Sequence, residues 1–205
     1  MFFIPNLAPQ LQRPVLYITC ALEILTIAHY HALRATRDSP GPLTPSFFCP
    51  SSSHTGKIPY LFVTPIAWFG TLLMAFGTFI RLQCYEALGP LFTFDLCIKP
   101  ERRLVTSGPY SFVRHPAYLG SLCLTAGLTF AGLTRGSWII ECAVGSHQTG
   151  PMIVTQCAWI SWWIYMVGVG CTRAIAEDEQ MRIKFGEEWE RYAMKVRYWF
   201  VPGLA

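Results

Sequence analysis

The sequence predicts an all-α protein, a multi-span transmembrane helical bundle of about four spans that ends in an amphipathic helix on the cytoplasmic side. Hydrophobic residues make up 52% of the 205 residues and charged residues only 14%, whereas about a quarter is charged in soluble domains. Aromatic residues reach 15% and include seven tryptophans, which favour membrane interfaces. The formal net charge of +4 is modest and does not indicate a nucleic-acid-binding protein.

Four stretches are apolar enough to be expected as spans: residues 15–33, 60–80, 117–133 and 152–171. Glu23 weakens the first, Pro65 interrupts the second, and the third is short for a bilayer that needs about 20 residues. The start of the chain has no basic region before its first apolar residues, so we expect no cleaved signal peptide. We interpret residues 1–205 as one membrane-embedded domain.

The distribution of positive charge predicts the orientation, because Lys and Arg accumulate in cytoplasmic loops. Of the 16 Lys and Arg residues, four lie on the side opposite the N-terminus (Arg34, Arg37, Lys57 and Arg135), and the remaining twelve lie on its own side. This places the loop 81–116 and the charged tail 173–205 together on the cytoplasmic face.

The eight cysteines are scattered and include no CxxC pair. Their spacing fits neither a zinc site nor a small disulfide scaffold. About half of them lie in apolar runs, where a thiol packs as a small hydrophobic group. We therefore expect reduced cysteines and no metal site.

The tail has apolar residues at helical spacing, namely Met181, Phe185, Trp189, Tyr192, Val196 and Trp199. Gly186 is expected to kink or divide this helix, and Pro202 to stop it. Oppositely charged residues four apart predict the supporting pairs Asp178–Arg182 and Glu187–Arg191. The simplest interpretation is an amphipathic helix lying on the membrane surface.

Two clusters of polar residues are expected to meet at the cytoplasmic interface. Tyr110, Arg114, His115 and Tyr118 surround the start of the third span, with Pro116 at the first helical position and Gly108–Pro109 in a turn before it; Arg173, Glu177 and Asp178 follow the fourth span. Taken singly, these residues are explained as charged anchors, interfacial aromatics and a solvated carboxylate. Together they suit a zwitterionic cofactor and an acidic substrate.

The motif "LVTSGPYSFVRHPAYLG" and, after one further span, "RAIAEDEQM" and "FGEEWERY" with a "VPG" ending resemble the isoprenylcysteine carboxyl methyltransferase family over residues 76–204. That family belongs to a wider group of membrane methyltransferases that includes phospholipid-methylating enzymes. The resemblance implies a multi-pass enzyme of the endoplasmic reticulum membrane whose active site faces the cytoplasm. It also implies S-adenosylmethionine as cofactor and the C-terminal carboxylate of a prenylated cysteine in CaaX-processed proteins as acceptor.

The resemblance also assigns roles to residues. Arg173 would hold the substrate carboxylate, and the C-terminal helix would close the cofactor site. The residues that match the family's cofactor contacts are Arg102, Arg103, Leu104, Val105, Tyr110, His115, Pro116, Ala117, Tyr118 and Glu177, with a looser match near Asp95.

The sequence departs from the family pattern at three places. Arg102 stands where many relatives have histidine, Asp178 replaces the second Glu of an acidic pair, and residues 134–150 replace a tight hairpin. Three alternatives stay open: a phospholipid N-methyltransferase, an NADPH-dependent sterol reductase, and a catalytically inactive membrane scaffold.

Overall fold

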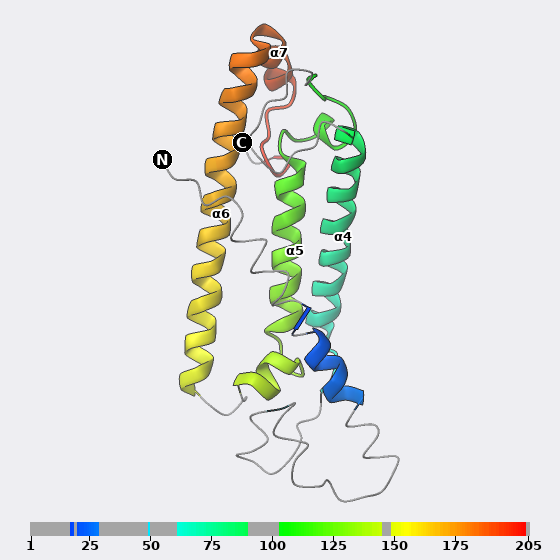
Figure 1. The fold of residues 1–205 in the computed structure, drawn as a ribbon, viewed down its shortest axis with the longest axis vertical. Coiled ribbons are helices and arrows are strands. Elements are labelled where there is room, and N and C mark those ends of the chain that lie inside the picture. Colours follow the sequence, from blue (N-terminus) through cyan, green and yellow to red (C-terminus); the bar gives the residue numbers. More distant parts are fainter. Residues whose placement is uncertain are drawn as a thin grey trace, which may run out of the picture. The chain divides into compact units, whose positions relative to one another are not determined.

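The computed structural model describes residues 17–18, 20–28, 49, 61–89, 103–144 and 149–203. Within them the protein is all-α, which confirms the predicted class (Figure 1). The elements are α4 (Pro65–Leu88), the 3₁₀ helix η2 (Gly108–Ser111), α5 (Pro116–Gly132), the π-helix η3 (Ile139–Val144), α6 (Thr149–Phe185) and α7 (Glu187–Lys195).

In the described part of the chain, two helices are long and apolar enough to cross a membrane, α4 and the segment Gly150–Phe185 of α6. Four spans were predicted. The third, α5, has 17 residues and is short for a hydrocarbon core that needs about 20. Residues 20–28 of the predicted first span are helical, but its ends lie outside the described residues.

Helices α4 and α6 carry large apolar side chains on their outer surfaces, as membrane helices do. Leu72, Phe79 and Leu82 of α4 and Ile160 and Ile164 of α6 are all more than half exposed. The core helix of a soluble protein would bury such residues. The protein is therefore a membrane protein with helical spans.

Helix α4 begins later and ends later than the predicted span 60–80. Pro65 is its first residue, where a missing N–H costs nothing, and the Thr64 hydroxyl accepts a hydrogen bond from the Ala67 N–H at 3.1 Å. This capped start explains why Pro65 does not interrupt the helix. Residues 81–88, which were predicted to belong to the cytoplasmic loop 81–116, form its last two turns.

The chain divides into two compact units. In the first, which includes residues 61–71 and 128–144, Cys49 and Cys142 form a disulfide, so the prediction that all cysteines are reduced is wrong. Both are buried beside Trp138. The bond joins residues 93 positions apart, and no local spacing rule could have paired them.

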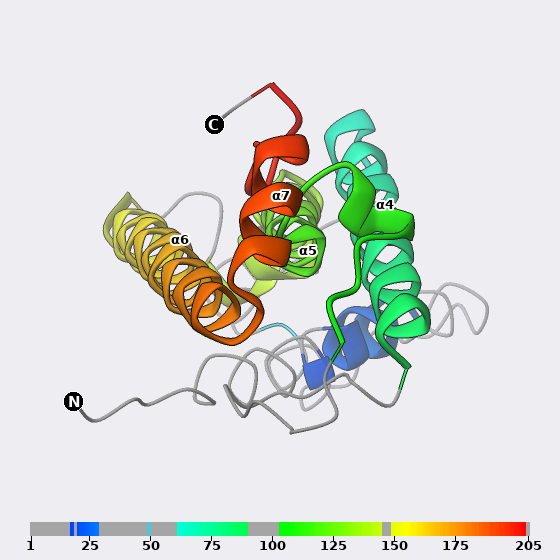
Figure 2. The same cartoon turned by 90° about the horizontal axis from the view of Figure 1, so that it is seen from above.

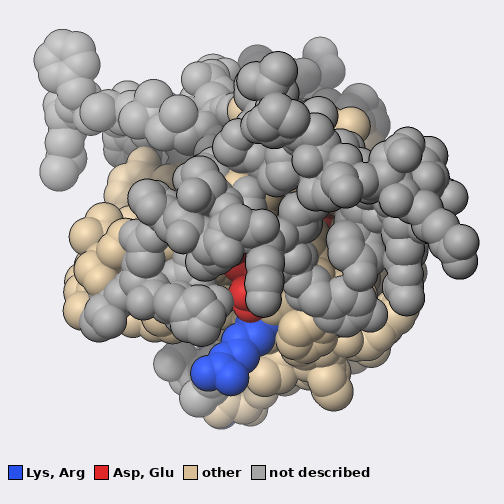
Figure 3. All heavy atoms as spheres, turned by 90° about the horizontal axis from the view of Figure 1, so that it is seen from below, with Lys and Arg blue, Asp and Glu red and all other residues tan. Residues whose placement is uncertain are grey.

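The same unit contains a tight backbone contact. Phe62 donates its N–H to the Gly136 carbonyl at 3.2 Å, and a Cβ at Gly136 would lie 2.3 Å from the Phe62 carbonyl oxygen. Gly136 also has φ +84°, so glycine is required there. The described surface drawn in Figure 3 is mostly uncharged, with few Lys, Arg, Asp or Glu atoms.

In the second unit, which includes residues 72–89, 103–127 and 162–203, α4 and α5 meet through glycines. A Cβ at Gly77 would lie 2.6 Å from the Gly120 carbonyl oxygen, and a Cβ at Gly120 would lie 2.8 Å from that of Gly77. Small residues at such crossings let membrane helices approach closely.

Gly186 divides the tail as predicted, with φ 51° between the end of α6 and the start of α7. The apolar stripe packs inside the unit rather than on a membrane surface. Trp189, Tyr192 and Val196 are buried, with Leu104, Met181 and Phe185 against them. Seen from above, α7 overlies the start of α5 (Figure 2). The helix ends at Lys195, so Trp199 lies beyond it and leaves the stripe.

The two predicted i, i+4 ion pairs are wrong. Arg182 instead lies 3.7 Å from Glu179 and 4.0 Å from Glu190, and Arg191 donates to the Glu187 carbonyl. Asp178 faces the other way, toward residues 114 and 115. For Asp178, contacts with Arg114 and His115 have replaced the predicted pair with Arg182.

Candidate functional site

The loop before α5 is fixed by its backbone. Gly108 has φ +61° and opens η2, in which Pro109 accepts from the Phe112 N–H at 3.2 Å. Pro116 then begins α5, as predicted, and the His115 carbonyl accepts from the Tyr118 N–H at 3.2 Å. The loop therefore places Arg114 and His115 directly before the first turn of α5.

Helix α6 presents two consecutive carboxylates to this loop. Arg114 Nη1 lies 2.6 Å from Asp178 Oδ2, and His115 Nε2 lies 2.8 Å from Asp178 Oδ1. The other ring nitrogen of His115, Nδ1, is 3.5 Å from Glu177 Oε2. The imidazole therefore lies between both acids.

Tyr118, one turn into α5, joins the same cluster. Its hydroxyl donates to Glu177 Oε1 at 2.7 Å and also interacts with the Arg173 side chain, one turn earlier on α6. The Glu177 side chain stays 29% exposed, whereas that of His115 is 7% exposed. Arg173, Glu177, Tyr118 and His115 thus form one continuous polar cluster.

The segment after α7 accepts hydrogen bonds from the loop before α5 through successive carbonyl groups. Arg114 Nη2 donates to the Arg197 carbonyl at 3.2 Å. The backbone N–H groups of Arg114 and His115 donate to the carbonyls of Tyr198 and Trp199, each at 2.9 Å. The two backbone bonds fix the loop independently of its side chains.

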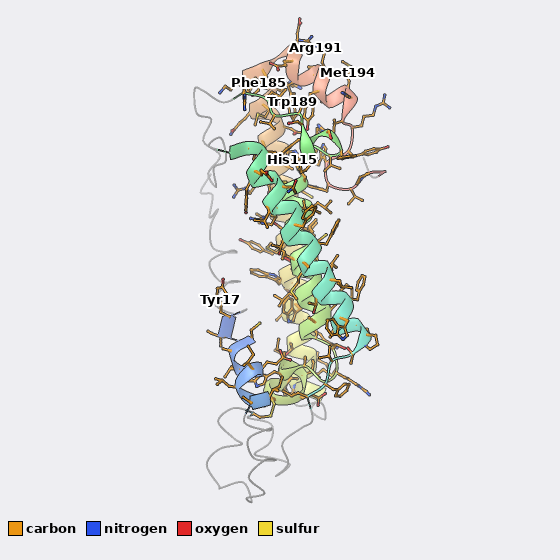
Figure 4. The ribbon with its side chains drawn as sticks, turned by 90° about the vertical axis from the view of Figure 1, so that its right-hand side faces the viewer. Tyr17, His115, Phe185, Trp189, Arg191 and Met194 are labelled. Carbon is orange, nitrogen blue, oxygen red and sulfur yellow. A yellow bond between two sulfur atoms is a disulfide. The ribbon has the colours of Figure 1, made fainter. Side chains whose placement is uncertain are left out.

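Aromatic rings surround the imidazole of His115. The Tyr118, Phe200 and Trp199 rings have centroids 5.8, 6.1 and 6.4 Å from it, and Phe200 also packs edge-on against Tyr118 at 6.1 Å. In Figure 4, His115 lies below α7 and Arg191 of α7 points outward. The ring is therefore held on several sides.

Burial and charge act in opposite directions on His115. Burial lowers the pKa of the imidazole, but hydrogen bonds to Asp178 and Glu177 outweigh it and raise the pKa above its ordinary value. The two carboxylates therefore favour the protonated form of the imidazole. Burial also raises the pKa of Tyr110 and of Tyr192, so both phenols stay neutral.

The structure brings together several of the predicted site residues. His115, Tyr118, Arg173 and Glu177 are in the cluster, and Tyr110 lies close enough for Glu177 to raise the pKa of its phenol. Pro116 is fully buried at the start of α5.

The remaining predicted residues lie elsewhere. Ala117 contributes its carbonyl, 3.5 Å from Arg81 Nη1. Leu104 packs against the stripe of α7, Arg103 is exposed and Val105 is half-buried. Arg102 lies outside the described residues, as does Asp95.

Sequence reasoning missed the positions of three residues. Arg81 was placed in a polar loop, but it lies in α4 and bonds to Ser121 of α5. Trp199 and Phe200 were assigned to the stripe or left without a role, yet they flank His115. The aromatic run "YWF" at 198–200, next to a predicted helix end, was the available signal.

Parts of this chain are similar to known proteins. The model of the phospholipid methyltransferase family matches residues 65–156. The chain is similar to a protein-S-isoprenylcysteine O-methyltransferase of Dictyostelium discoideum, 26% identical over 143 residues that cover 67% of this chain and 49% of the relative. It is also similar to the Delta(14)-sterol reductase TM7SF2 of Mus musculus, 27% identical over 101 residues that cover 49% of this chain and 19% of that protein.

The chain therefore spans about half the length of the first relative and about a fifth of the second. The family match covers α4, α5 and the first turns of α6. It confirms the resemblance that the motifs predicted.

Proposed function

We propose that the chain, whose residues 65–156 match the phospholipid methyltransferase family, transfers the methyl group of S-adenosylmethionine to the C-terminal carboxylate of a prenylated cysteine. The similarity to the Dictyostelium methyltransferase supports this acceptor. We also propose the endoplasmic reticulum membrane as its location, with the cluster of Arg173 and Glu177 facing the cytoplasm.

The residues of the cluster fit the amino-acid end of this cofactor. Glu177 Oε1 accepts from Tyr118, but each carboxylate oxygen can accept about two hydrogen bonds and this side chain is 29% exposed. Glu177 would therefore hold the ammonium group, with Tyr118 beside it. When bound, the cofactor supplies an electrophilic methyl group on a positively charged sulfur.

The observation that carries the choice of acceptor is the charge of the cluster. Arg114 and Arg173 balance the carboxylates of Glu177 and Asp178, and the raised pKa of His115 favours a further positive charge. An acceptor carboxylate would balance this excess, whereas a cationic amine would increase it. A carboxylate acceptor (α-carboxyl pKa about 3.5) is also already ionised at neutral pH, so no general base is needed.

Arg173 is the residue best suited to orient that acceptor. It lies one turn before Glu177 on α6, so the two side chains share a helical face. Its guanidinium offers a planar set of donors that matches a carboxylate and stays charged. Catalysis then depends on alignment of the acceptor, and alignment alone accounts for up to about 7–11 kcal/mol in favourable cases.

The test uses the purified full chain in detergent with labelled S-adenosylmethionine and N-acetyl-S-farnesyl-cysteine. Base-labile methyl transfer is expected for the wild type. Arg173→Ala should abolish transfer while cofactor affinity stays close to that of the wild type, and Glu177→Gln should weaken cofactor binding. Glu179→Gln is the matched control, because Glu179 is exposed and pairs with Arg182 on the surface.

The second candidate is methylation of a phospholipid amine, which the description of the matched family favours. Phosphatidylethanolamine vesicles replace the farnesyl-cysteine in a parallel assay. Methyl transfer to the lipid alone, in a form that base does not release, would reject the carboxylate acceptor. Cofactor binding without transfer to either acceptor would reject both.

A further inference from the structure

Asp178 uses both of its carboxylate oxygens on the loop before α5. Oδ2 is 2.6 Å from Arg114 Nη1 and Oδ1 is 2.8 Å from His115 Nε2, and the side chain is 15% exposed. Its neighbour Glu177 is nearly twice as exposed. The two consecutive acids therefore differ in their surroundings. Both oxygens of Asp178 contact protein groups, whereas the Glu177 carboxylate stays partly exposed to solvent.

The imidazole of His115 connects Asp178 with Glu177, because it contacts both carboxylates. With Nε2 bonded to Asp178, the opposite nitrogen of the ring, Nδ1, is directed toward Glu177 Oε2 at 3.5 Å. A half-turn of the ring would exchange its nitrogens for carbon atoms at both carboxylates. Such an imidazole–carboxylate contact fixes the orientation and protonation of the ring in many sites.

We propose that Asp178 is a positioning residue of this site, which anchors Arg114 and holds His115 so that its second nitrogen orients the Glu177 carboxylate. The proposal deepens the proposed function, because it assigns Asp178 a role that acts through His115 and Glu177 rather than by contact with the cofactor.

The effect of neutralising Asp178 depends on the other charged and titratable groups around His115. Glu177 and Asp178 face the ring from α6, Arg114 precedes it on the loop, and Tyr118 approaches it from α5. Arg173 acts on Glu177, and Tyr192 of α7 lies within the electrostatic reach of Asp178. Removal of the Asp178 charge would leave His115 with one carboxylate and with Arg114 unpaired beside it.

The first measurement is the titration of His115 by NMR in the full chain, labelled at histidine and purified in detergent. The chain has five histidines, and His115→Gln assigns the signal. In the wild type, we expect the titration midpoint of His115 to lie above the pH of about 6.5 at which free imidazole titrates. In Asp178→Asn, which keeps the shape and removes the charge, its midpoint should fall by about one unit or more, and Asp178→Glu should restore it.

The second measurement is the affinity for S-adenosylhomocysteine by calorimetry on the same proteins. Asp178→Asn should bind about tenfold more weakly, as expected when a charge-assisted hydrogen bond that orients a binding group is lost. Asp178→Glu should recover most of the affinity, and the surface variant Glu179→Gln should match the wild type. Recovery by the longer acid separates positioning from a general loss of folding.

Two results would overturn the proposal: an unchanged His115 titration in Asp178→Asn, or a shifted titration with undiminished affinity. A wild type that binds no S-adenosylhomocysteine would count against the proposed function instead. In that case the His115 titration still decides whether Asp178 holds the imidazole.

Discussion

The hydroxyl of Tyr192 donates a hydrogen bond of 2.7 Å to the carbonyl oxygen of Tyr110, 82 positions earlier in the chain. It joins α7 to η2 at the side of the unit that carries the polar cluster. Because Tyr192 is only 7% exposed, the bond is shielded from water. The position of the tail helix is therefore tied directly to the loop that presents His115.

Tyr192→Phe removes this hydrogen bond and little else. The Tyr110 carbonyl would lose its partner in a buried place, so the free energy of unfolding should fall by about 1–2 kcal/mol. Thermal unfolding of the detergent-purified protein measures the change. Tyr198→Phe is the control, since Tyr198 is 37% exposed, and equal melting temperatures for the two variants would contradict the role of this bond.

Gly77→Ala should be among the most damaging small substitutions in the described part of the chain. The new methyl group would lie 2.6 Å from the Gly120 carbonyl oxygen and 2.9 Å from the Leu124 nitrogen, and neither backbone atom can move without displacing a helix. Overpacking of this kind costs about 1–3 kcal/mol or more. The yield of folded protein and its thermal midpoint would report the effect.

The matched control for Gly77→Ala is Gly168→Ala, also inside a long apolar helix. A Cβ at Gly168 meets no atom within 4 Å, and alanine favours the helix by about 1 kcal/mol over glycine. This variant should be as stable as the wild type or more so. If both substitutions destabilise equally, close contact between α4 and α5 is not the cause.

Local patterns predicted the local features well. Pro116 begins α5 and Gly186 separates α6 from α7, because each depends on the backbone preferences of one residue. The apolar stripe of the tail was also predicted, since Trp189, Tyr192 and Val196 share a helical face whatever covers them. What covers them, Leu104 and the loop near Tyr110, could not be read from periodicity.

Long-range partners decided the predictions that failed. The rule for residues four apart paired Asp178 with Arg182, but Arg114, 64 positions earlier, lies against Asp178 instead. Trp199 kept the spacing of the stripe, but the helix ends before it, and its ring flanks His115. In each case a buried contact outweighed a weak preference on the helix surface, which is worth only about 0.2–0.5 kcal/mol per pair.

The charge on His115 should make stability depend on pH. Its pKa is raised in the folded protein, so its contribution is fully present below the unfolded pKa of about 6.5 and is lost as pH rises through the higher folded value. The difference in thermal midpoint between wild type and His115→Gln should therefore shrink as pH increases above about 6.5. A difference that grows with pH would mean that the imidazole is neutral in the folded protein.

The disulfide between Cys49 and Cys142 should be present in protein taken directly from membranes. Both residues lie in connections that the Lys and Arg distribution assigns to the side opposite the cytoplasm, where oxidising conditions preserve such bonds. Mass spectrometry after alkylation of the denatured, unreduced protein should find these two cysteines blocked until a reductant is added, whereas Cys157, which is free, should react without one. Cys142→Ser should lower the free energy of unfolding by about 2–4 kcal/mol, and Cys157→Ser should not. Alkylation of Cys49 and Cys142 without reductant would place that end of the protein in a reducing compartment and reverse the orientation argued from charge.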